Sequence, residues 1–274
     1  MVAAAEDLGV SHGAVSRQIT RLEGIVGQPL FERTARGLVL TQAGQSLAAS
    51  ARDGFQRVRS GLDLLRADDR RSIRLLAPPN LSLRWIGPRL SRLAAAIAPA
   101  RLDIAAQNLD DPSGDVVLRW YAGQPLPAGG TVLFGDDAFP VASPAMAARI
   151  KDASDLKKEP RIGFASSPDW SCWARAVGLS PEALKPTVVV SDTSIALEAA
   201  AAGDGVAMAR LPLVLSDLQS GRLVICPGPV VPTGGAYVLM APTPRPGSML
   251  AQRLSAELIR MAAETVEQGR SLLP

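Results

Sequence analysis

Hydrophobic residues recur at two different spacings, which divide the chain into two parts. In residues 1–70 the apolar positions lie three or four apart and Pro29 is the sole proline, a spacing typical of amphipathic helices. From Ser72 onward, short apolar runs alternate with Ala-rich stretches. The runs are Ile73–Ala77, Val116–Leu118, Val132–Phe134, Val188–Val190, Val206–Ala209 and Tyr237–Ala241. This alternation predicts an α/β domain with a largely parallel sheet. The polar segment Arg66–Arg71 is the expected linker.

A helix-turn-helix is predicted close to the start. Ala3–Leu8 reads as a short helix, and Gly9 suits the left-handed position that ends one. Ser11 is a strong N-cap for a second helix that runs to about Val26. On this second helix, the residues expected to face the protein core are Val15, Ile19, Leu22 and Val26.

The opposite face of the second helix suits contact with nucleic acid. It carries short polar groups and two arginines, without a carboxylate before Glu23, and phosphates repel carboxylates. The residues are Ser11, His12, Ser16, Arg17, Gln18, Thr20 and Arg21. Two short strands around Ala35–Gly37 would add a wing whose Arg36 could enter a minor groove. The alternative is an ordinary helix pair with one solvated face.

A long helix is expected from Thr41 to about Leu65. Its apolar stripe has a near-heptad spacing, which favours pairing with another helix. The positions proposed for dimerisation are Leu47, Ala51, Phe55, Val58 and Leu62. The alternative is that this stripe packs against the second domain of the same chain.

Composition excludes several classes of protein. The 274 residues are 47% hydrophobic and carry a net charge of +3, so a nucleic-acid partner has to be argued from local placement rather than total charge. No apolar stretch is long enough for a membrane span and no export signal begins the chain, so a cytoplasmic location is expected. Two cysteines cannot form a disulfide framework, and Cys172 and Cys226 are expected to be buried structural thiols. With His12 as the single histidine, we expect no metal site, no catalytic triad and no cofactor.

Residues 3–44 closely resemble the DNA-binding region of LysR-type transcriptional regulators. The matching runs are Ala3–Ser11, Ala14–Ile19, Leu22–Glu23, Gly27, Pro29–Phe31, Arg33, Arg36–Gly37, Leu40–Thr41 and Ala43–Gly44. The resemblance implies that Ser11, His12, Ser16, Arg17 and Gln18 approach DNA, together with Arg33, Thr34 and Arg36 of the wing. For Arg33 the alternative is a salt bridge with Glu32 or Glu23. The family has a further helix ahead of the one near Val2, and we expect this chain to lack it.

The remainder of the chain resembles, more loosely, the ligand-sensing domain of the same family. It is most similar to the subgroup of the glycine-cleavage activator and the β-lactamase regulator. The resembling runs are Pro78–Trp85, Asp115–Trp120, Pro168–Trp170, Ala202–Pro212, Asp217–Leu218 and Gly221–Val224. The resemblance implies a fold like that of periplasmic binding proteins, with two α/β lobes and a ligand between them. We expect crossovers near Ala142–Pro144 and Met240–Pro242.

Two predicted strands end in turns that could bind a small ligand in that cleft. Because ligands bind beyond the carboxyl ends of strands, where helix N-termini present free N–H groups, these turns suit a carboxylate or other anion. The expected effector-binding residues are Asn80, Ser82, Ser166, Asp169, Trp170, Asp192, Thr193 and Ser194. The alternative is that Asn80, Ser191 and Thr193 merely cap helices.

Together these features predict an α plus α/β architecture. The expected parts are a winged helix-turn-helix (1–44), a linker and dimerisation helix (41–70) and an effector domain (72–274), whose lobes cover about 72–142 with 241–274 and about 143–240. The predicted function is that of a DNA-binding transcriptional regulator that responds to a small molecule. Its expected partners are double-stranded palindromic promoter DNA, a small effector and further copies of itself in a homodimer or homotetramer. The alternative is a ligand-binding module that has lost DNA binding, and an α/β enzyme ranks last.

Overall fold

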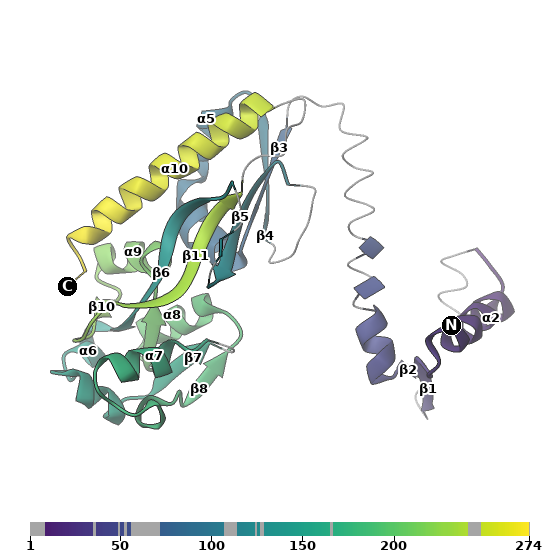
Figure 1. Ribbon diagram of the computed structural model, residues 1–274, viewed down its shortest axis with the longest axis horizontal. Helices are drawn as coiled ribbons and strands as arrows, with labels where there is room; N and C mark the ends of the chain where they lie inside the picture. Colours follow the sequence, from purple (N-terminus) through teal and green to yellow (C-terminus); the bar gives the residue numbers. More distant parts are fainter. Residues whose placement is uncertain are drawn as a thin grey trace. The chain divides into compact units, whose positions relative to one another are not determined.

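The computed structural model describes residues 9–34, 37–48, 50–51, 54–55, 72–106, 114–123, 125–126, 129–164, 167–240 and 248–273. The chain divides into two compact units, Met1–Asp68 and Asp69–Pro274 (Figure 1). No helix among the described residues is both long enough and apolar enough to span a bilayer.

The first unit contains a helix and a two-stranded sheet. The helix is α2 (His12–Val26), and the strands are β1 (Phe31–Thr34) and β2 (Gly37–Leu40). β1 and β2 pair antiparallel, with Phe31 opposite Leu40 and Thr34 opposite Gly37. A further helix begins at residue 42 and is described, with gaps, to residue 55. Its first turn is capped as expected, because the Thr41 hydroxyl accepts a hydrogen bond from the Gly44 N–H at 3.0 Å.

The second unit is built on a nine-stranded sheet. Its strand order is β4-β3-β5-β11-β6-β9-β7-β8, and β10 pairs with β6. The strands are β3 (Ser72–Ala77), β4 (Arg101–Ala106), β5 (Val116–Ala122), β6 (Thr131–Ala142), β7 (Arg161–Phe164), β8 (Val188–Val190), β9 (Val206–Ala209), β10 (Val224–Ile225) and β11 (Val231–Met240). The helices are α4 (Pro79–Leu81), α5 (Leu90–Ile97), α6 (Pro144–Ala147), α7 (Asp169–Ala176), α8 (Thr193–Ala202), α9 (Leu211–Ser220) and α10 (Ser248–Arg270).

The sheet is parallel at both ends and antiparallel in the middle. β3 pairs parallel with β4 and β5, and β7 pairs parallel with β8 and β9. The central pairs β5–β11, β11–β6 and β6–β9 are antiparallel. The expectation of a largely parallel sheet therefore holds only for the two outer groups, because β6 and β11 run in opposite directions between them.

β6 and β11 join two lobes. The first lobe contains β3, β4 and β5 with the C-terminal part of β11, and the second contains β7, β8 and β9 with the C-terminal part of β6. β6 pairs with β11 from Thr131 to Ala138 and with β9 from Phe139 to Val141. The β11–β6 register is interrupted between Pro232 and Ala236. The chain thus crosses from one lobe to the other in the middle of β6 and of β11. The crossovers expected from the sequence lie later, at the C-terminal ends of these strands.

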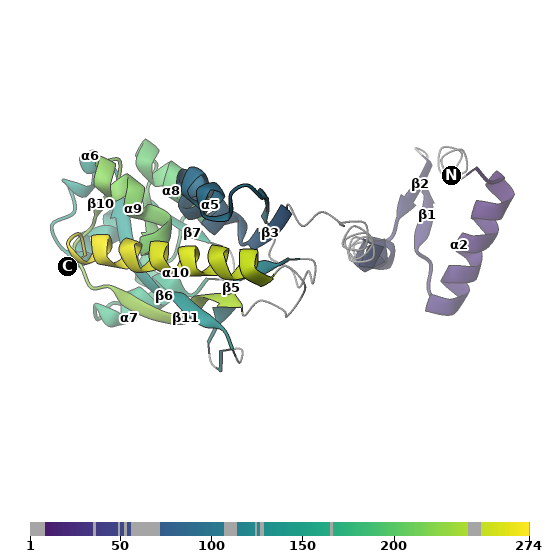
Figure 2. The same cartoon turned by 90° about the horizontal axis from the view of Figure 1, so that it is seen from above.

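A helical segment whose pitch changes along its length follows β3 and carries Asn80. After α4 come a wide turn (Ser82–Ile86) and a tight turn (Gly87–Arg89) that lead into α5. The indole of Trp85 is fully buried and donates to the Thr265 hydroxyl of α10 at 2.9 Å. Because α10 also packs along α5 and α9 (Figure 2), this bond fixes the segment that carries Asn80.

Candidate functional site

The N-cap of α2 is the residue that the sequence predicts, and the helix ends at Val26 as expected. The Ser11 hydroxyl accepts from the Ala14 N–H at 3.2 Å, and the C-cap is Gly27, whose φ of 77° is left-handed. The first turn of α2 contains no acidic residue. Ser11, Arg17 and Gln18 are exposed and Ser16 is half-buried, while the side chain of His12 lies outside the described residues. The described part of this face is therefore polar, accessible and without a carboxylate, as DNA contact requires.

The opposite face of α2 is less buried than expected. Val15 and Ile19 are half-buried, but Leu22 and Val26 are 42% and 37% exposed. The expectation that all four face a core is wrong for these two.

The wing is partly described. β1 and β2 form the expected hairpin, but Ala35 and Arg36 and the side chains of Arg33 and Thr34 lie outside the described residues. Sequence reasoning missed the role of Glu23, whose Oε1 accepts from the backbone N–H groups of Leu30 and Phe31 at 2.8 and 3.1 Å. This carboxylate joins the end of α2 to the start of the hairpin.

The expected pairing stripe is described only in its first half. Leu47 is half-buried, Ala51 is exposed and Phe55 is 76% exposed, whereas Val58 and Leu62 lie outside the described residues. Phe55 therefore offers an exposed aromatic side chain to a partner helix.

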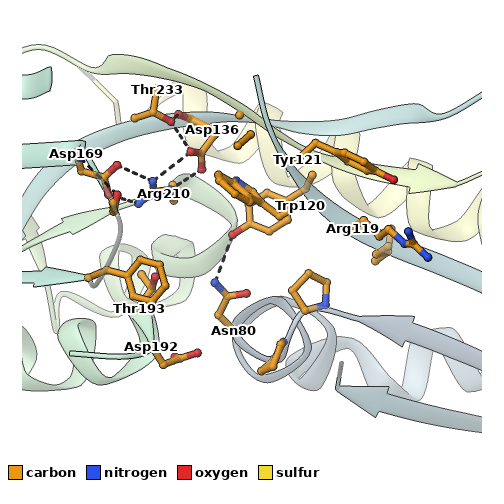
Figure 3. Close-up of a pocket in the computed structure, with 18 of the residues that line it drawn as sticks. Asn80, Arg119, Trp120, Tyr121, Asp136, Asp169, Asp192, Thr193, Arg210 and Thr233 are labelled. Carbon is orange, nitrogen blue, oxygen red and sulfur yellow. Dashed lines mark hydrogen bonds and ion pairs between the residues drawn. The ribbon is translucent and has the colours of Figure 1, made fainter. Parts of the chain in front are cut away.

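The second unit contains a cavity of about 520 Å³, lined from both lobes. Pro78, Asn80 and Trp120 line it from the first lobe, and Thr193 and Arg210 line it from the second (Figure 3). Asp136 of β6 and Thr233 of β11 lie where the two strands cross between lobes. A molecule in this cavity would contact both lobes at once.

Four of the expected effector residues line this cavity. These are Asn80, Asp169, Asp192 and Thr193. Ser82 does not line it, and its hydroxyl donates to the Ala77 carbonyl at 3.3 Å. Ser194 is buried behind the lining, and Ser166 lies outside the described residues.

Trp170 also lies outside the cavity lining. It packs in the core of the second lobe, where its indole donates to the Ile162 carbonyl at 2.9 Å. The apolar side of α7 carries it inward, because the α7 residues Trp173 and Ala174 are buried in the same cluster.

A buried ionic cluster, formed by Arg210, Asp136 and Asp169, lies at one end of the cavity. Nε and Nη2 of Arg210 donate to Asp136 at 2.5 and 3.1 Å, and Nη1 and Nη2 donate to Asp169 at 2.7 and 2.9 Å. The three residues are 7%, 3% and 4% exposed. Burial of unpaired charges at this depth would be costly, so each carboxylate compensates the guanidinium.

The cluster holds Asp136 in its ionised form. Burial by itself would raise the pKa of this carboxyl, but the hydrogen bonds and charge of Arg210, with hydrogen bonds from Thr233 and Trp120, bring the pKa below its usual value. Burial of Arg210 is likewise outweighed by its two carboxylate partners, which raise its pKa.

Aromatic residues form much of the remaining wall. Tyr237 of β11 is buried, and burial raises the pKa of its phenol; the hydroxyl accepts from Asn80 Nδ2 at 3.5 Å. Gly235 allows β11 to pair closely beside β5, because a Cβ there would lie 2.9 Å from the Tyr121 carbonyl oxygen and 3.0 Å from the Trp120 ring.

Several residues that line the cavity were not predicted from the sequence. For two of them, Asp136 and Arg210, the sequence contains a pattern that indicates a buried polar site. Asp136 and Asp137 interrupt the apolar pattern in the middle of β6, and Arg210 directly follows the buried strand β9. A charge within a buried strand or at its end marks a candidate buried polar site. The missed lining residues are Arg119, Trp120, Tyr121, Asp136, Phe164, Arg210, Thr233 and Tyr237.

Comparison with known families identifies both units. The model described as "Bacterial regulatory helix-turn-helix protein, lysR family" matches residues 1–45, and the "LysR substrate binding domain" model matches residues 66–263. The chain belongs to the LysR family. It is therefore a transcriptional regulator with a helix-turn-helix and an effector-binding domain, rather than an enzyme. Because the first family model begins at residue 1 and residues 1–8 are not described, the expected lack of a helix stays untested.

Individual LysR-family proteins are similar over most of the chain. The transcriptional regulator TrpI of Pseudomonas aeruginosa is 37% identical over 270 residues, covering 93% of this chain and 91% of TrpI. The glycine cleavage system transcriptional activator of Escherichia coli is 31% identical over 232 residues, covering 82% and 76%. The solved effector domain of AmpR from Pseudomonas aeruginosa superposes with a TM-score of 0.59 at 25% identity, covering 73% of this chain and 98% of that domain. This regulator thus has the two-lobed LysR effector fold.

The described residues offer no group for a metal. Among them, no cluster of three or more His, Cys, Asp or Glu side chains is arranged to hold an ion.

Proposed function

We propose that this LysR-family regulator binds palindromic double-stranded promoter DNA as a homodimer or homotetramer, and that a small effector in the cavity biases the relative orientation of the two lobes. The observation that carries the proposal is the cavity itself, because its walls come from both lobes and from the strands that join them. A ligand that fits one lobe orientation better than another shifts the population toward it.

The DNA contact is assigned to α2 and the hairpin. The proposed residues are those expected from the sequence, and the exposure of Arg17 and Gln18 supports them. Dimerisation through the helix after Thr41, in which Phe55 is exposed, would place two copies of α2 on successive turns of a palindromic site. We accordingly keep the division into a DNA-binding part (1–44), a pairing helix (41–70) and an effector domain (72–274), and a cytoplasmic location.

The alternative function, a ligand-binding module without DNA binding, is not favoured. The helix-turn-helix family model extends over residues 1–45, and the capped helix α2 presents an accessible polar face.

A mobility-shift assay with the DNA immediately upstream of the gene tests the proposal. We expect the unmodified chain to shift this fragment and Arg17→Ala to weaken binding by about ten-fold or more, the usual cost of one lost base or phosphate contact. The matched control is Arg253→Ala, which removes an exposed arginine from α10. Absence of any shift by the unmodified chain at low salt, or equal binding by both variants, contradicts the assignment.

A further inference from the structure

The described residues that line the cavity carry more acidic than basic groups. The acidic ones are Asp136, Asp169 and Asp192, and the basic ones are Arg119 and Arg210. Figure 3 shows Arg119 pointing away from the cluster of Arg210, Asp136 and Asp169. The chemistry of the ligand therefore depends on what Arg210 and the helix ends nearby can still bind.

The protein's own carboxylates accept four hydrogen bonds from Arg210, whose guanidinium has five N–H donors. Two of these bonds are with Asp136 and two are with Asp169. A bidentate pair with a ligand carboxylate would require one of these buried aspartates to lose its partner, which is strongly unfavourable. The cluster as a whole carries one excess negative charge.

The N-terminus of α8 is occupied in the same way. Asp192 is its N-cap, and Oδ1 accepts from the Ser194 N–H at 2.6 Å. A helix N-terminus attracts anions, but here a carboxylate of the chain takes that place. At both of these positions the chain's own carboxylates stand where a ligand anion would bind, and the other basic residue of the described lining is Arg119.

The rest of the cavity suits a flat apolar body and a cation. Trp120 and Phe164 line it and remain 46% and 40% exposed, so their rings are available to a ligand. Aromatic faces attract cations, and the effect increases when the cation is shielded from water. The Asp192 carboxylate lies on the side of the cavity that Asn80 and Thr193 also line (Figure 3).

We infer that the effector carries a protonated amine on a flat apolar body, with the amine held near Asp192 and the ionic cluster and the body against the aromatic wall. This inference rests on the proposed role of the cavity as the effector site. A cavity of about 520 Å³ is in the range that holds one- or two-ring compounds. The proposed amine takes the place of the anionic ligand that the turn residues alone predict.

Three probes of matched shape test the inference by calorimetry on the full-length chain. Tryptamine carries the cation, indole-3-propionate carries a carboxylate, and 3-ethylindole is uncharged. We expect tryptamine to bind at least ten-fold more tightly than either of the others. Asp192→Asn removes the charge while keeping a good N-cap, so tryptamine affinity should fall about ten-fold with α8 intact. Asp204→Asn removes an exposed carboxylate that does not line the cavity and should leave the affinity unchanged.

The outcomes separate this inference from the proposed function. Equal binding of 3-ethylindole, tighter binding of indole-3-propionate, no binding by any probe, or an undiminished affinity in Asp192→Asn each overturns the amine inference. The same preparations are tested on promoter DNA. A chain that shifts DNA but prefers the carboxylate keeps its regulatory function with another effector class, whereas a chain that shifts no DNA contradicts the function itself.

Discussion

Arg84 donates a hydrogen bond from Nη1 to Asp217 Oδ2 at 2.7 Å, joining the turn after β3 to α9. Its Nη2 contacts the Ser194 carbonyl at 3.2 Å and Glu198 Oε1 at 2.7 Å, both on α8. α4, directly before this turn, carries Asn80, and α8 begins with Thr193; these two residues line the cavity from opposite lobes. Arg84 thus connects the two sides of the site from behind.

Removing Arg84 should loosen this connection. The Arg84 and Asp217 side chains are 9% and 8% exposed, and loss of one partner leaves a buried charge, so Arg84→Ala should lower the free energy of unfolding by about 2–4 kcal/mol. Arg222→Ala removes a second, 51% exposed partner of Asp217 and should cost under about 1 kcal/mol. Urea denaturation measures the free energy of unfolding of both variants. Equal losses in the two would contradict a special role for Arg84 in connecting the lobes.

The ionic cluster should make the free energy of unfolding depend on pH in the acidic range. The pKa of Asp136 is lower in the folded chain than in the unfolded chain, so its contribution is complete above about pH 4, the ordinary carboxyl value, and is lost as the pH falls through the folded pKa. The free energy of unfolding of the unmodified chain and of Asp136→Asn should differ at pH 7 and converge at lower pH. Urea titrations at several pH values measure this, with the exposed Asp204→Asn as the control variant. A difference that does not change with pH contradicts the role given to Asp136.

The two cysteines should differ in reactivity. Burial, with a smaller effect of the Glu159 charge, raises the pKa of the Cys226 thiol to about 12, so about one molecule in ten thousand is thiolate at pH 8. Cys172 is partly exposed. Iodoacetamide should therefore label Cys172 in the native chain and both cysteines in denaturant, as peptide mass spectrometry will show. In Cys172→Ser native labelling should disappear, and rapid native labelling of Cys226 would be inconsistent with its burial.

The exposed Phe55 should matter for assembly. A charged residue in an apolar contact between helices is strongly disfavoured, so Phe55→Asp should convert the oligomer to a smaller species in light scattering. Met249→Asp, which changes another strongly exposed apolar residue (72%), should leave the mass unchanged. If Phe55→Asp retains the full oligomeric mass, another surface joins the subunits.

Local pattern predicted elements better than it predicted the site. Val188–Val190 and Val206–Ala209 are strands with the expected bounds, because compact apolar runs have few alternatives. β4 was missed, since Arg101 and Asp103 interrupt its apolar pattern at the edge of the sheet. The N-cap Ser11 was predicted because capping depends on neighbours a few positions away, whereas for α8 the expected caps were Ser191 and Thr193 and the N-cap is Asp192.

The spacing of apolar residues along the chain could not predict the cavity. Trp120, Asp136 and Arg210 come together from three strands or strand ends far apart in the sequence. Spacing along the chain does not reveal which strands become neighbours, and it therefore gave no sign that Arg210 pairs with Asp136 and Asp169.

The passage of β6 and β11 between lobes has a mechanical consequence. Any rotation of one lobe against the other must twist these strands near Asp136 and Thr233, and the Thr233 hydroxyl donates to the Asp136 backbone carbonyl at 2.5 Å and also to its carboxylate. The axis of such a rotation runs through the wall that a bound molecule would contact. In the proposed mechanism, the residues that contact the effector would therefore also be those about which the lobes rotate.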